Sequence, residues 1–351
     1  MLEYISVMRL KRVLIKKIKF VLQIIALLII IVLLINNIDI FRSTNTDKNS
    51  VIGTDSNISI LFCPEQNCLN ALINEITHAK NSIYCAVYDI DVDKLKLLAD
   101  LNKKGLDVRI VSDDRQAKRK NSIVKFLIDN NIARVDFEEK AYMHNKFCIF
   151  DHNTVWVGSA NFTNNGFFKN NNNIVIVRDS KIAKVFEEEF MELWNGVFNG
   201  GKENGLVSKN IEAYFCPEDK CMEKVLEKLN SANKSIYCMA FSFTHNKMKD
   251  LLIKKFQKGV DIKVIFESRQ ISKYSAYKDL ANKEISVIKD KNNATMHNKF
   301  CIIDSNIVIT GSMNFSKHAD EENDESIIIL KDQNIASAYE NYFGKYWGAW
   351  R

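Results

Sequence analysis

The feature that most constrains the fold is an internal repeat with a spacing of 153 residues. Four segments of the first half return almost unchanged in the second half at this offset. They are FCPEQNC (62–68) with FCPEDKC (215–221), NSIYCAVY (81–88) with KSIYCMAF (234–241), MHNKFCIFD (143–151) with MHNKFCIID (296–304), and GSANFT (158–163) with GSMNFS (311–316). Because such a repeat has the length of a domain, the sequence predicts two similar lobes, at 59–205 and 211–351.

Each lobe has the alternating pattern of an α/β fold. Runs rich in β-branched residues predict strands in the first lobe at 57–63, 82–88, 107–113, 146–151 and 154–159. Apolar residues at helical spacing predict one helix that begins at Pro64, one that ends at Gly105 and one at 181–196, the last repeated at 333–348. We therefore expect an α/β sandwich of mixed sheet and flanking helices, duplicated about a pseudo-twofold axis.

The N-terminus has the pattern of a membrane anchor. Residues 1–42 carry seven basic and two acidic side chains, so +5 of the net charge of +6 lies there. The apolar run 20–35, FVLQIIALLIIIVLLI, would span about 24 Å as a helix. Since the positive charges precede this run, we expect a single membrane span with a cytoplasmic N-terminus, a polar tether at 43–58 and extracytoplasmic lobes. A cleaved signal peptide is the alternative, although no A-x-A-like cleavage site follows.

The most closely repeated segments carry the candidate chemistry. In each lobe a strand reads His-Asn-Lys-Phe-Cys-Ile-x-Asp, and a Gly-Ser-x-Asn sequence follows it. Residues two apart on a strand share a face, so His144 points with Lys146, and His297 with Lys299. A lysine charge and an asparagine amide can hold a phosphate, while an imidazole attacks it or protonates a leaving oxygen. A lone histidine is usually structural, but the second copy argues against that interpretation here.

This pattern resembles the HKD motif of the phospholipase D superfamily, and the resemblance covers about 290 residues in both lobes. It implies a monomer with one active site between the lobes, a covalent phosphohistidine intermediate and no metal cofactor. His144, in the first motif, would be the nucleophile, and His297 the general acid and base. The reverse assignment stays open, because two nearly identical motifs cannot be ranked by sequence.

The resemblance also assigns roles to the surrounding residues. The positions carried over as catalytic are His144, Lys146, Asp151, His297, Lys299, Asp304 and Glu325, and those expected to hold phosphate are Ser159, Asn161, Ser312 and Asn314. The lysines and asparagines would stabilise the charge on the non-bridging oxygens. Asp151 and Asp304 lie on the opposite strand face, so we expect them to be buried partners of the local backbone rather than substrate ligands.

One position departs from the family pattern. The family commonly has a glutamate after Gly-Ser-x-Asn that orients a histidine. The second lobe has Glu325 there, whereas the first lobe has Asn172. An amide accepts a hydrogen bond from imidazole but does not stabilise the imidazolium charge as a carboxylate does. We therefore expect an active enzyme whose two histidines differ in basicity; a weakened first half or an inactive scaffold is the alternative.

The eight cysteines fall into two matched sets of four at the same offset. In an extracytoplasmic protein such a set is compatible with disulfides, and we favour Cys63–Cys68 and Cys216–Cys221. Free thiols or a zinc site remain alternatives for these four. The other cysteines lie inside predicted strands and are interpreted as small buried hydrophobic residues: Cys85, Cys148, Cys238 and Cys301.

The substrate class is the least constrained prediction. The basic loops 115–120 and 269–273 follow strands and are either phosphate-gripping rims or solvated loops. An anchor would hold the site near lipid head groups, and the remaining 309 residues carry a charge of only +1, which weakens the argument for nucleic acid. The sequence thus favours hydrolysis of phospholipid phosphodiesters. An extracytoplasmic endonuclease cleaving DNA or RNA and a phosphatidyl transferase of the cardiolipin synthase type are the alternatives.

Overall fold

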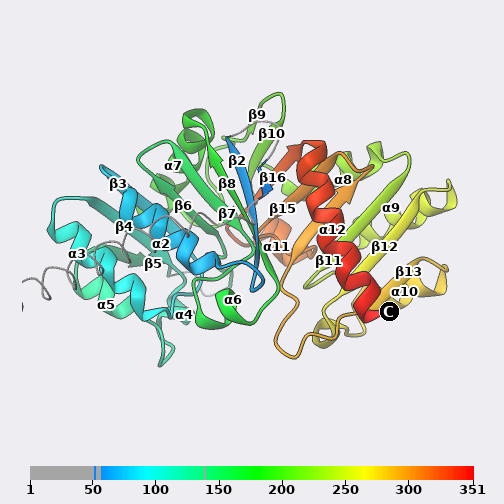
Figure 1. Ribbon diagram of the computed structural model, residues 1–351, viewed down its shortest axis with the longest axis horizontal. Helices are drawn as coiled ribbons and strands as arrows, with labels where there is room; N and C mark the ends of the chain where they lie inside the picture. The colour runs from blue at the N-terminus through cyan, green and yellow to red at the C-terminus, as the bar shows by residue number, and fades with distance from the viewer. Residues whose placement is uncertain (1–50, 53–56, 138–139) are drawn as a thin grey trace, which may run out of the picture. The chain divides into compact units, whose positions relative to one another are not determined.

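The computed structural model describes residues 51–52, 57–137 and 140–351, which form two lobes that each contain an eight-stranded mixed sheet (Figure 1). The first sheet has the order β1 (Val51–Ile52), β2 (Ile58–Cys63), β8 (Asn172–Arg178), β7 (Thr154–Gly158), β6 (Lys146–Phe150), β3 (Ser82–Val87), β4 (Asp107–Ser112) and β5 (Ala133–Val135). The second sheet repeats this order with β9 (Leu206–Val207), β10 (Ile211–Cys216), β16 (Glu325–Lys331), β15 (Ile307–Gly311), β14 (Lys299–Ile303), β11 (Ser235–Ala240), β12 (Asp261–Phe266) and β13 (Ser286–Lys289). The predicted duplicated α/β architecture is therefore confirmed.

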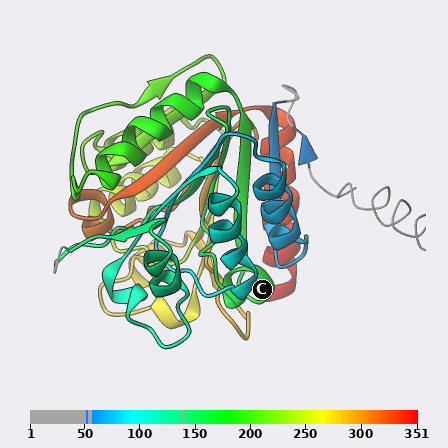
Figure 2. The ribbon, with the colours of Figure 1, turned by 90° about the vertical axis from the view of Figure 1, so that its left-hand side faces the viewer.

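Helices cover both faces of each sheet. In the first lobe they are α2 (Cys68–His78), η1 (Asp93–Lys96), α3 (Leu97–Lys103), α4 (Asp114–Ala117), α5 (Val124–Asp129), α6 (Asn164–Phe168) and α7 (Ser180–Trp194). In the second they are α8 (Cys221–Ser231), α9 (Asn246–Gln257), η2 (Ser268–Gln270), α10 (Tyr277–Asn282), α11 (Lys317–Glu321) and α12 (Gln333–Trp350). Figure 2 shows α7 on one face of the first sheet and α2 and α3 on the other.

Two local predictions about helix ends have different outcomes. The helix expected to begin at Pro64 begins instead at Cys68, because the side chain of Asn67 accepts a hydrogen bond from the Asn70 amide and caps it there. The prediction of a start at Pro64 is wrong. Gly105 does follow the end of α3, with a φ of +100° that favours glycine.

A single hydrophobic core joins the two lobes. It contains inward-facing residues of both sheets together with the apolar faces of α7 and α12. Each of these helices also lies against the other lobe: Phe186 of α7 packs edge-on against Phe215 of β10 at 5.0 Å, and Tyr342 of α12 stacks on Phe62 of β2 at 4.1 Å. Burying one aromatic side chain contributes about 1.5–3 kcal/mol to the stability of the fold. Because rings of both lobes are buried in one cluster, the interface between the lobes is a continuous part of the core rather than a surface contact. Two further clusters fill the remaining sheet faces, one in each lobe.

Strand direction brings the predicted catalytic residues to one edge of the two sheets. β6 and β14 begin two residues after His144 and His297, and β3, β4, β11 and β12 end at the same edge, which we call the histidine edge. The glycine of each Gly-Ser-x-Asn sequence allows the neighbouring strand to approach there. A Cβ on Gly158 would lie 2.1 Å from the Asn173 carbonyl oxygen, and one on Gly311 would lie 2.1 Å from that of Ser326.

All eight cysteines form disulfides. The structure contains the expected Cys63–Cys68 and Cys216–Cys221 bonds. It also joins the four strand cysteines that were interpreted as buried hydrophobic residues, in the pairs Cys85–Cys148 and Cys238–Cys301. The reason is the antiparallel register: β3 and β6 place the members of the first pair directly opposite each other, as β11 and β14 do for the second, with Cα atoms 4.1 and 4.2 Å apart.

The N-terminal predictions fall mostly outside the described residues. The membrane anchor at 1–42 lies wholly outside them, as does most of the tether at 43–58. Within the tether, Val51–Ile52 form β1 and pair with β2, so that stretch is a strand rather than a flexible linker. Among the described helices, none combines the length and the hydropathy that a membrane crossing requires.

The two kinds of disulfide are expected to differ in their effect on stability. Cys85–Cys148 closes a separation of 63 residues, whereas Cys63–Cys68 closes only 5. On chain-entropy grounds, replacing both members of the long pair with alanine should lower the free energy of unfolding by about 4 kcal/mol, and replacing the short pair by about 2 kcal/mol. Urea denaturation of the full chain measures both losses, and the reduced wild type is the control. Equal losses would contradict the prediction.

Candidate active site

The two histidine segments are held together by backbone hydrogen bonds that cross between the lobes. Each histidine donates its amide hydrogen to a carbonyl of the opposite lobe, and the acceptor residue donates back two residues upstream of that histidine. The bonds are His144 N to Asp324 O (2.9 Å), Asp324 N to Tyr142 O (3.0 Å), His297 N to Asn171 O (2.9 Å) and Asn171 N to Thr295 O (2.9 Å). This exchange fixes both histidines at the boundary between the lobes.

Glu325 orients the histidine of the other lobe. Its Oε1 lies 2.7 Å from His144 Nδ1, and its Oε2 accepts a hydrogen bond from Ser312 Oγ at 2.6 Å. Glu325 has no exposed surface, and although burial opposes its ionisation, the facing His144 imidazole holds its pKa below the ordinary value. A carboxylate at Nδ1 keeps the ring proton there, which leaves the Nε2 lone pair free.

Asn172 performs the same task for the second histidine without a charge. Its Oδ1 accepts from His297 Nδ1 at 3.0 Å and from Ser159 Oγ at 2.8 Å, while its Nδ2 donates to the Gly166 carbonyl. Asn172 and Glu325 are therefore equivalent positions, each acting across the lobe boundary. The two histidines have different partners, as the sequence predicts, and the structure adds that the carboxylate faces His144.

The two serines expected to bind phosphate are engaged elsewhere. Ser159 and Ser312 are completely buried, and each gives its hydroxyl proton to the side chain that orients a histidine. A hydroxyl has one proton to donate, so neither serine can also donate to a phosphate oxygen. Their assignment as phosphate ligands is corrected: they hold Asn172 and Glu325 in position. Asn161 and Asn314, by contrast, are half-buried on the loops that follow β7 and β15, at the histidine edge.

The lysines of the two motifs are buried beside the histidines. Lys146 and Lys299 are 1% and 2% exposed, and their Nζ atoms donate to the carbonyls of His144 and His297 at 2.6 and 2.8 Å. Burial lowers the pKa of Lys146 to about 7 and that of Lys299 well below its ordinary value. Burying two ammonium groups costs free energy, and a bound anion would compensate their positive charge. The two lysines therefore form a candidate anion-binding site.

Burial also keeps both histidines neutral. The pKa of His144 falls to about 4, because desolvation and Lys146 outweigh the opposing effect of Glu325. The pKa of His297 is also well below its ordinary value, through burial and through the neighbouring Lys299, Lys146 and His144. A neutral imidazole has the free lone pair that nucleophilic attack requires. Both histidines are therefore available as nucleophiles or bases in the neutral pH range.

The aspartates of the two motifs lie far from this chemistry. Asp151 accepts hydrogen bonds from the amides of Lys80, Asn81 and Ser82, and Asp304 accepts from those of residues 233–235. Each lies beyond its five-residue strand, β6 or β14, about 16 Å from the histidine edge. Their catalytic assignment is corrected to a structural one. The expected contact with the backbone is present, but the carboxylates are half-buried rather than buried.

Several residues near the histidines were missed by the sequence analysis. Tyr88 and Phe241 hold equivalent positions, each with its ring 4.7 Å from a histidine ring. Tyr88 is the last residue of the repeated segment 81–88, and Phe241 is the last residue of its copy at 234–241. The repeat therefore marked the two positions as equivalent, but nothing in the sequence placed them beside the histidines. Asp136 and Glu267 were also missed; their carboxylates accept the amide hydrogens of Met143 and Met296, just before the histidines.

The two basic loops differ in their contacts. Arg115 lies over the Tyr142 ring at 3.7 Å and donates to the Ala141 carbonyl, whereas Arg269 pairs with Glu267 at 2.6 Å. Both arginines thus support the segments that lead into the histidines. The lysines farther along the first loop, Lys118 and Lys120, are exposed.

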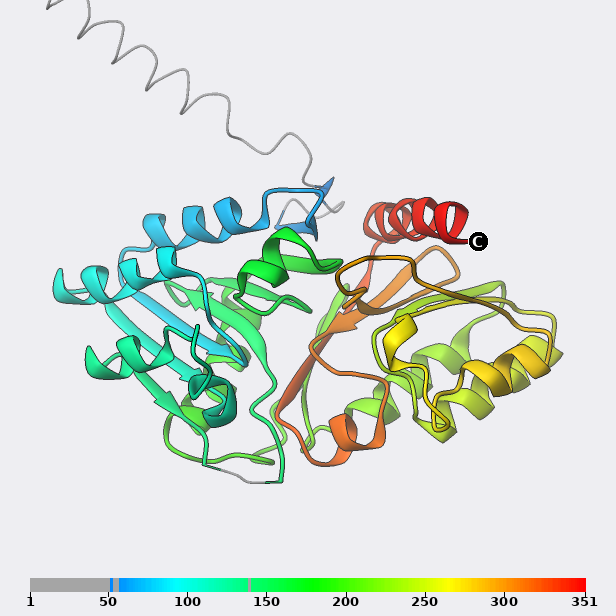
Figure 3. The same cartoon turned by 90° about the horizontal axis from the view of Figure 1, so that it is seen from below.

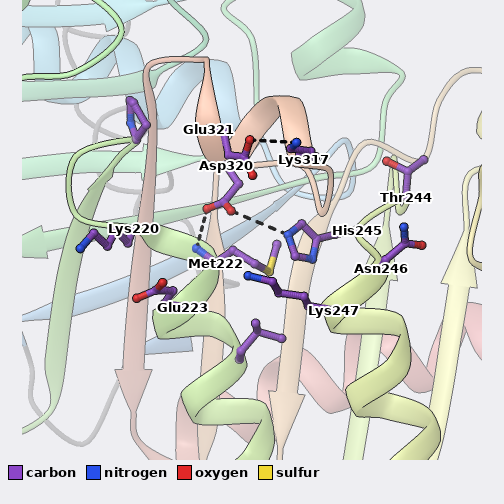
Figure 4. A pocket seen from close by; sticks show the side chains of 12 residues that line it. Lys220, Met222, Glu223, Thr244, His245, Asn246, Lys247, Lys317, Asp320 and Glu321 are labelled. Atoms are coloured by element: carbon purple, nitrogen blue, oxygen red, sulfur yellow. Dashed lines mark hydrogen bonds and ion pairs between the residues drawn. The ribbon is translucent and has the colours of Figure 1, made fainter.

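A separate pocket of about 590 Å³ lies on the second lobe between α8, α9 and α11. Figure 4 shows His245 beside Asp320, with the two side chains 3.7 Å apart. Lys220, Lys247 and Lys317 also line it, together with acidic side chains of similar number. None of the predicted site residues lines this pocket, and its mixed charge makes it a poor match for an anion.

The chain is similar to several known proteins. A family model described as "Cardiolipin synthase, PLD-like domain" matches residues 72–194 and again 225–347. A phospholipase D of Rickettsia typhi is 32% identical over 142 residues, covering 40% of this chain and 70% of that protein. A mitochondrial cardiolipin hydrolase of Chlamydomonas reinhardtii is 28% identical over 150 residues, covering 42% and 66%. The crystal structure of a Haemophilus influenzae phosphatidylserine synthase shares the fold, with a TM-score of 0.62, 13% identity and coverage of 85% and 88%.

Replacing Glu325 with glutamine should separate its electrostatic role from its packing. The amide keeps the shape of the side chain but removes the charge that raises the pKa of His144. We expect kcat to fall by about two orders of magnitude and the acid limb of kcat/KM to move to lower pH. Steady-state kinetics across pH measure both effects.

Glu187→Gln is the matched control. Glu187 makes the same kind of contact, 2.7 Å from His152 Nδ1, but at an exposed site. This variant should leave the pH profile and kcat unchanged. A Glu325→Gln enzyme with wild-type kcat, or with an unmoved acid limb, would contradict the role given to the carboxylate.

Proposed function

Because the chain belongs to the phospholipase D superfamily and is a phosphodiesterase-type hydrolase, we propose that it hydrolyses the head-group phosphodiester bond of phospholipids through a phosphohistidine intermediate. One observation carries the proposal: two neutral histidines, each oriented at Nδ1 by the opposite lobe, lie beside two buried lysines. This arrangement supplies two imidazoles whose Nδ1 atoms are held, together with a positive potential at one boundary. In-line displacement at phosphorus requires one imidazole on each side.

The first step forms a bond between a histidine and phosphorus. The anionic phosphodiester binds against Lys146 and Lys299, and Nε2 of His144 attacks phosphorus. The bond to the leaving alcohol oxygen breaks, and His297 gives that oxygen a proton. The bound anion favours the imidazolium form of His297 that this step needs, since it offsets the lysine charges that lower the His297 pKa. The amides of Asn161 and Asn314 add donors for the non-bridging oxygens.

The second step releases the phosphate product. His297, now neutral, takes a proton from a water molecule, whose oxygen attacks phosphorus from the side the alcohol has left. The phosphorus–nitrogen bond breaks, and His144 returns to its neutral form. The two lysines stabilise the negative charge of the pentacoordinate arrangement in both steps.

The unequal partners of the histidines support this division of roles. Attack places positive charge on the nucleophilic imidazole, and the Glu325 carboxylate stabilises that charge on His144. Release of a proton is favoured where no carboxylate holds it, and the side chain that orients His297 at Nδ1 is the Asn172 amide. We therefore propose that His144, in the first motif, is the nucleophile.

Two observations and one prediction support a lipid substrate over nucleic acid. The curated relatives named above are a phospholipase D and a cardiolipin hydrolase. The predicted N-terminal anchor would keep the lobes outside the cytoplasm and near head groups. The charge of +1 on residues 43–351 gives little attraction for a polyanion. Transfer to an alcohol in place of water would use the same first step.

The covalent intermediate can be trapped with an activated substrate. p-Nitrophenolate leaves without an acid, so His297→Ala should still undergo the first step with bis(p-nitrophenyl) phosphate but fail to activate water. We expect a burst of one equivalent of nitrophenolate and a phosphoryl adduct on His144, located by mass spectrometry. His144→Ala should give no burst. A burst in His144→Ala with the adduct on His297 would reverse the assignment.

The substrate class is tested by offering the full chain several substrates in parallel. We expect head-group release from phosphatidylglycerol vesicles that is insensitive to EDTA and abolished by His144→Ala or His297→Ala. Cleavage of DNA without lipid hydrolysis would instead support the endonuclease. Formation of a diphosphatidyl product would support transfer, and activity lost in EDTA would contradict the mechanism.

A further inference from the structure

Exposed aromatic side chains are concentrated in one region of the molecule. In the described part of the chain, three are more than half exposed: Phe137 at 69%, Phe168 at 54% and Tyr274 at 70%. Isolated exposed apolar residues are ordinary on protein surfaces, so their number carries no argument. Their location carries the argument, because all three lie in segments that connect strands at the histidine edge.

Each of the three follows a strand that ends at this edge. Phe137 lies between β5 and β6, next to Asp136, whose carboxylate holds the Met143 amide. Phe168 ends α6, between β7 and β8, three residues before Asn171, which holds the His297 amide. Tyr274 lies in the loop between η2 and α10, after β12. Figure 3 looks onto these loops, with α6 and α11 on either side of the boundary between the lobes.

Lysines accompany two of these rings, whereas Phe137 is followed in the sequence by Glu138 and Glu139 before Lys140. Lys169 follows Phe168 directly, Lys273 Nζ lies 4.9 Å from the centre of the Tyr274 ring, and Lys120 is exposed on the loop after β4. The neighbouring acidic groups of α11 are paired, Glu321 with Lys317 and Glu322 with His318. Aromatic tips beside lysines match the interface of an anionic bilayer, where the rings enter the head-group layer and the ammonium groups meet phosphates.

We propose that Phe137, Phe168 and Tyr274 form a docking face that seats the histidine edge on the surface of an anionic bilayer. The proposal rests on the lipid hydrolysis proposed above and adds how the substrate is reached. With this face on the membrane, a phosphodiester enters the space between the lobes from the head-group layer, and its acyl chains stay in the bilayer.

An exposed apolar residue at the opposite edge of the sheets can serve as a control. Val207 is 65% exposed on β9, where it pairs with Glu212 near the start of β10. β10 runs from there to Cys216 at the histidine edge, so Val207 lies about one strand length away from the docking face. An apolar residue of similar exposure is thus available outside the docking face as a matched control.

The test compares two substrates in the full chain. The variant carries Phe137→Ser, Phe168→Ser and Tyr274→Ser, and the control carries Val207→Ser. Rates are measured on vesicles of equal phosphatidylglycerol and phosphatidylcholine and on the soluble diester bis(p-nitrophenyl) phosphate. Rates are compared rather than the amount of bound protein, because the N-terminal segment is present in every variant. We expect the triple variant to lose about tenfold or more on vesicles and to keep the soluble rate within about twofold.

Each outcome distinguishes the proposals. A vesicle rate equal to that of the wild type overturns the docking face and leaves lipid hydrolysis standing. An equal loss on both substrates also overturns it, because the rings would then support the site itself. A Val207→Ser enzyme that loses as much of its vesicle rate as the triple variant also overturns the docking face. Removing an exposed apolar side chain far from the histidine edge would then have the same effect. A wild type that cleaves the soluble diester or DNA but no vesicle lipid overturns the proposed function and the docking face together.

Discussion

The active site depends on the four backbone hydrogen bonds that cross between the lobes beside the histidines. They place His144 within reach of Glu325, and His297 within reach of Asn172, residues that belong to the opposite lobe in each case. The shared core continues this arrangement outward, since α7 and α12 each pack on the first long strand of the other lobe. A movement of one lobe against the other would therefore separate each histidine from the group that sets its tautomer.

The buried basic side chains at the boundary between the lobes favour the binding of an anion from outside the chain. Burial lowers the pKa values of both lysines and both histidines, and the Lys146 charge lowers those of Lys299, His144 and His297 further. Glu325 is the one carboxylate in hydrogen-bonding contact with either of these two histidines in the described structure. The cost of burying these groups is offset when a phosphodiester supplies the missing negative charge. In the proposed mechanism the same anion shifts the proton balance of His297 toward the acid form, which couples binding to activation.

Much of this organisation could be predicted from the repeat. The 153-residue offset predicted the lobes, the motif residues and the asymmetry at Glu325 and Asn172. Contacts between distant segments could not be predicted in the same way. Cys85 and Cys148 face each other only because β3 and β6 are neighbours, and Ser159 points at Asn172 rather than at substrate because the glycine before it brings two strands together. The spacing of residues in the sequence shows which of them lie on the same face of a strand. It does not show which residues of other strands they contact.

The unequal pair at Asn172 and Glu325 also bears on the history of the molecule. An assembly of two identical copies carries the same side chain on both sides of its axis, so it would have had two glutamates or two asparagines. Only after the coding sequence was doubled could one copy change without the other. In a molecule that arose by doubling one such copy, the difference between Asn172 and Glu325 is therefore younger than the duplication.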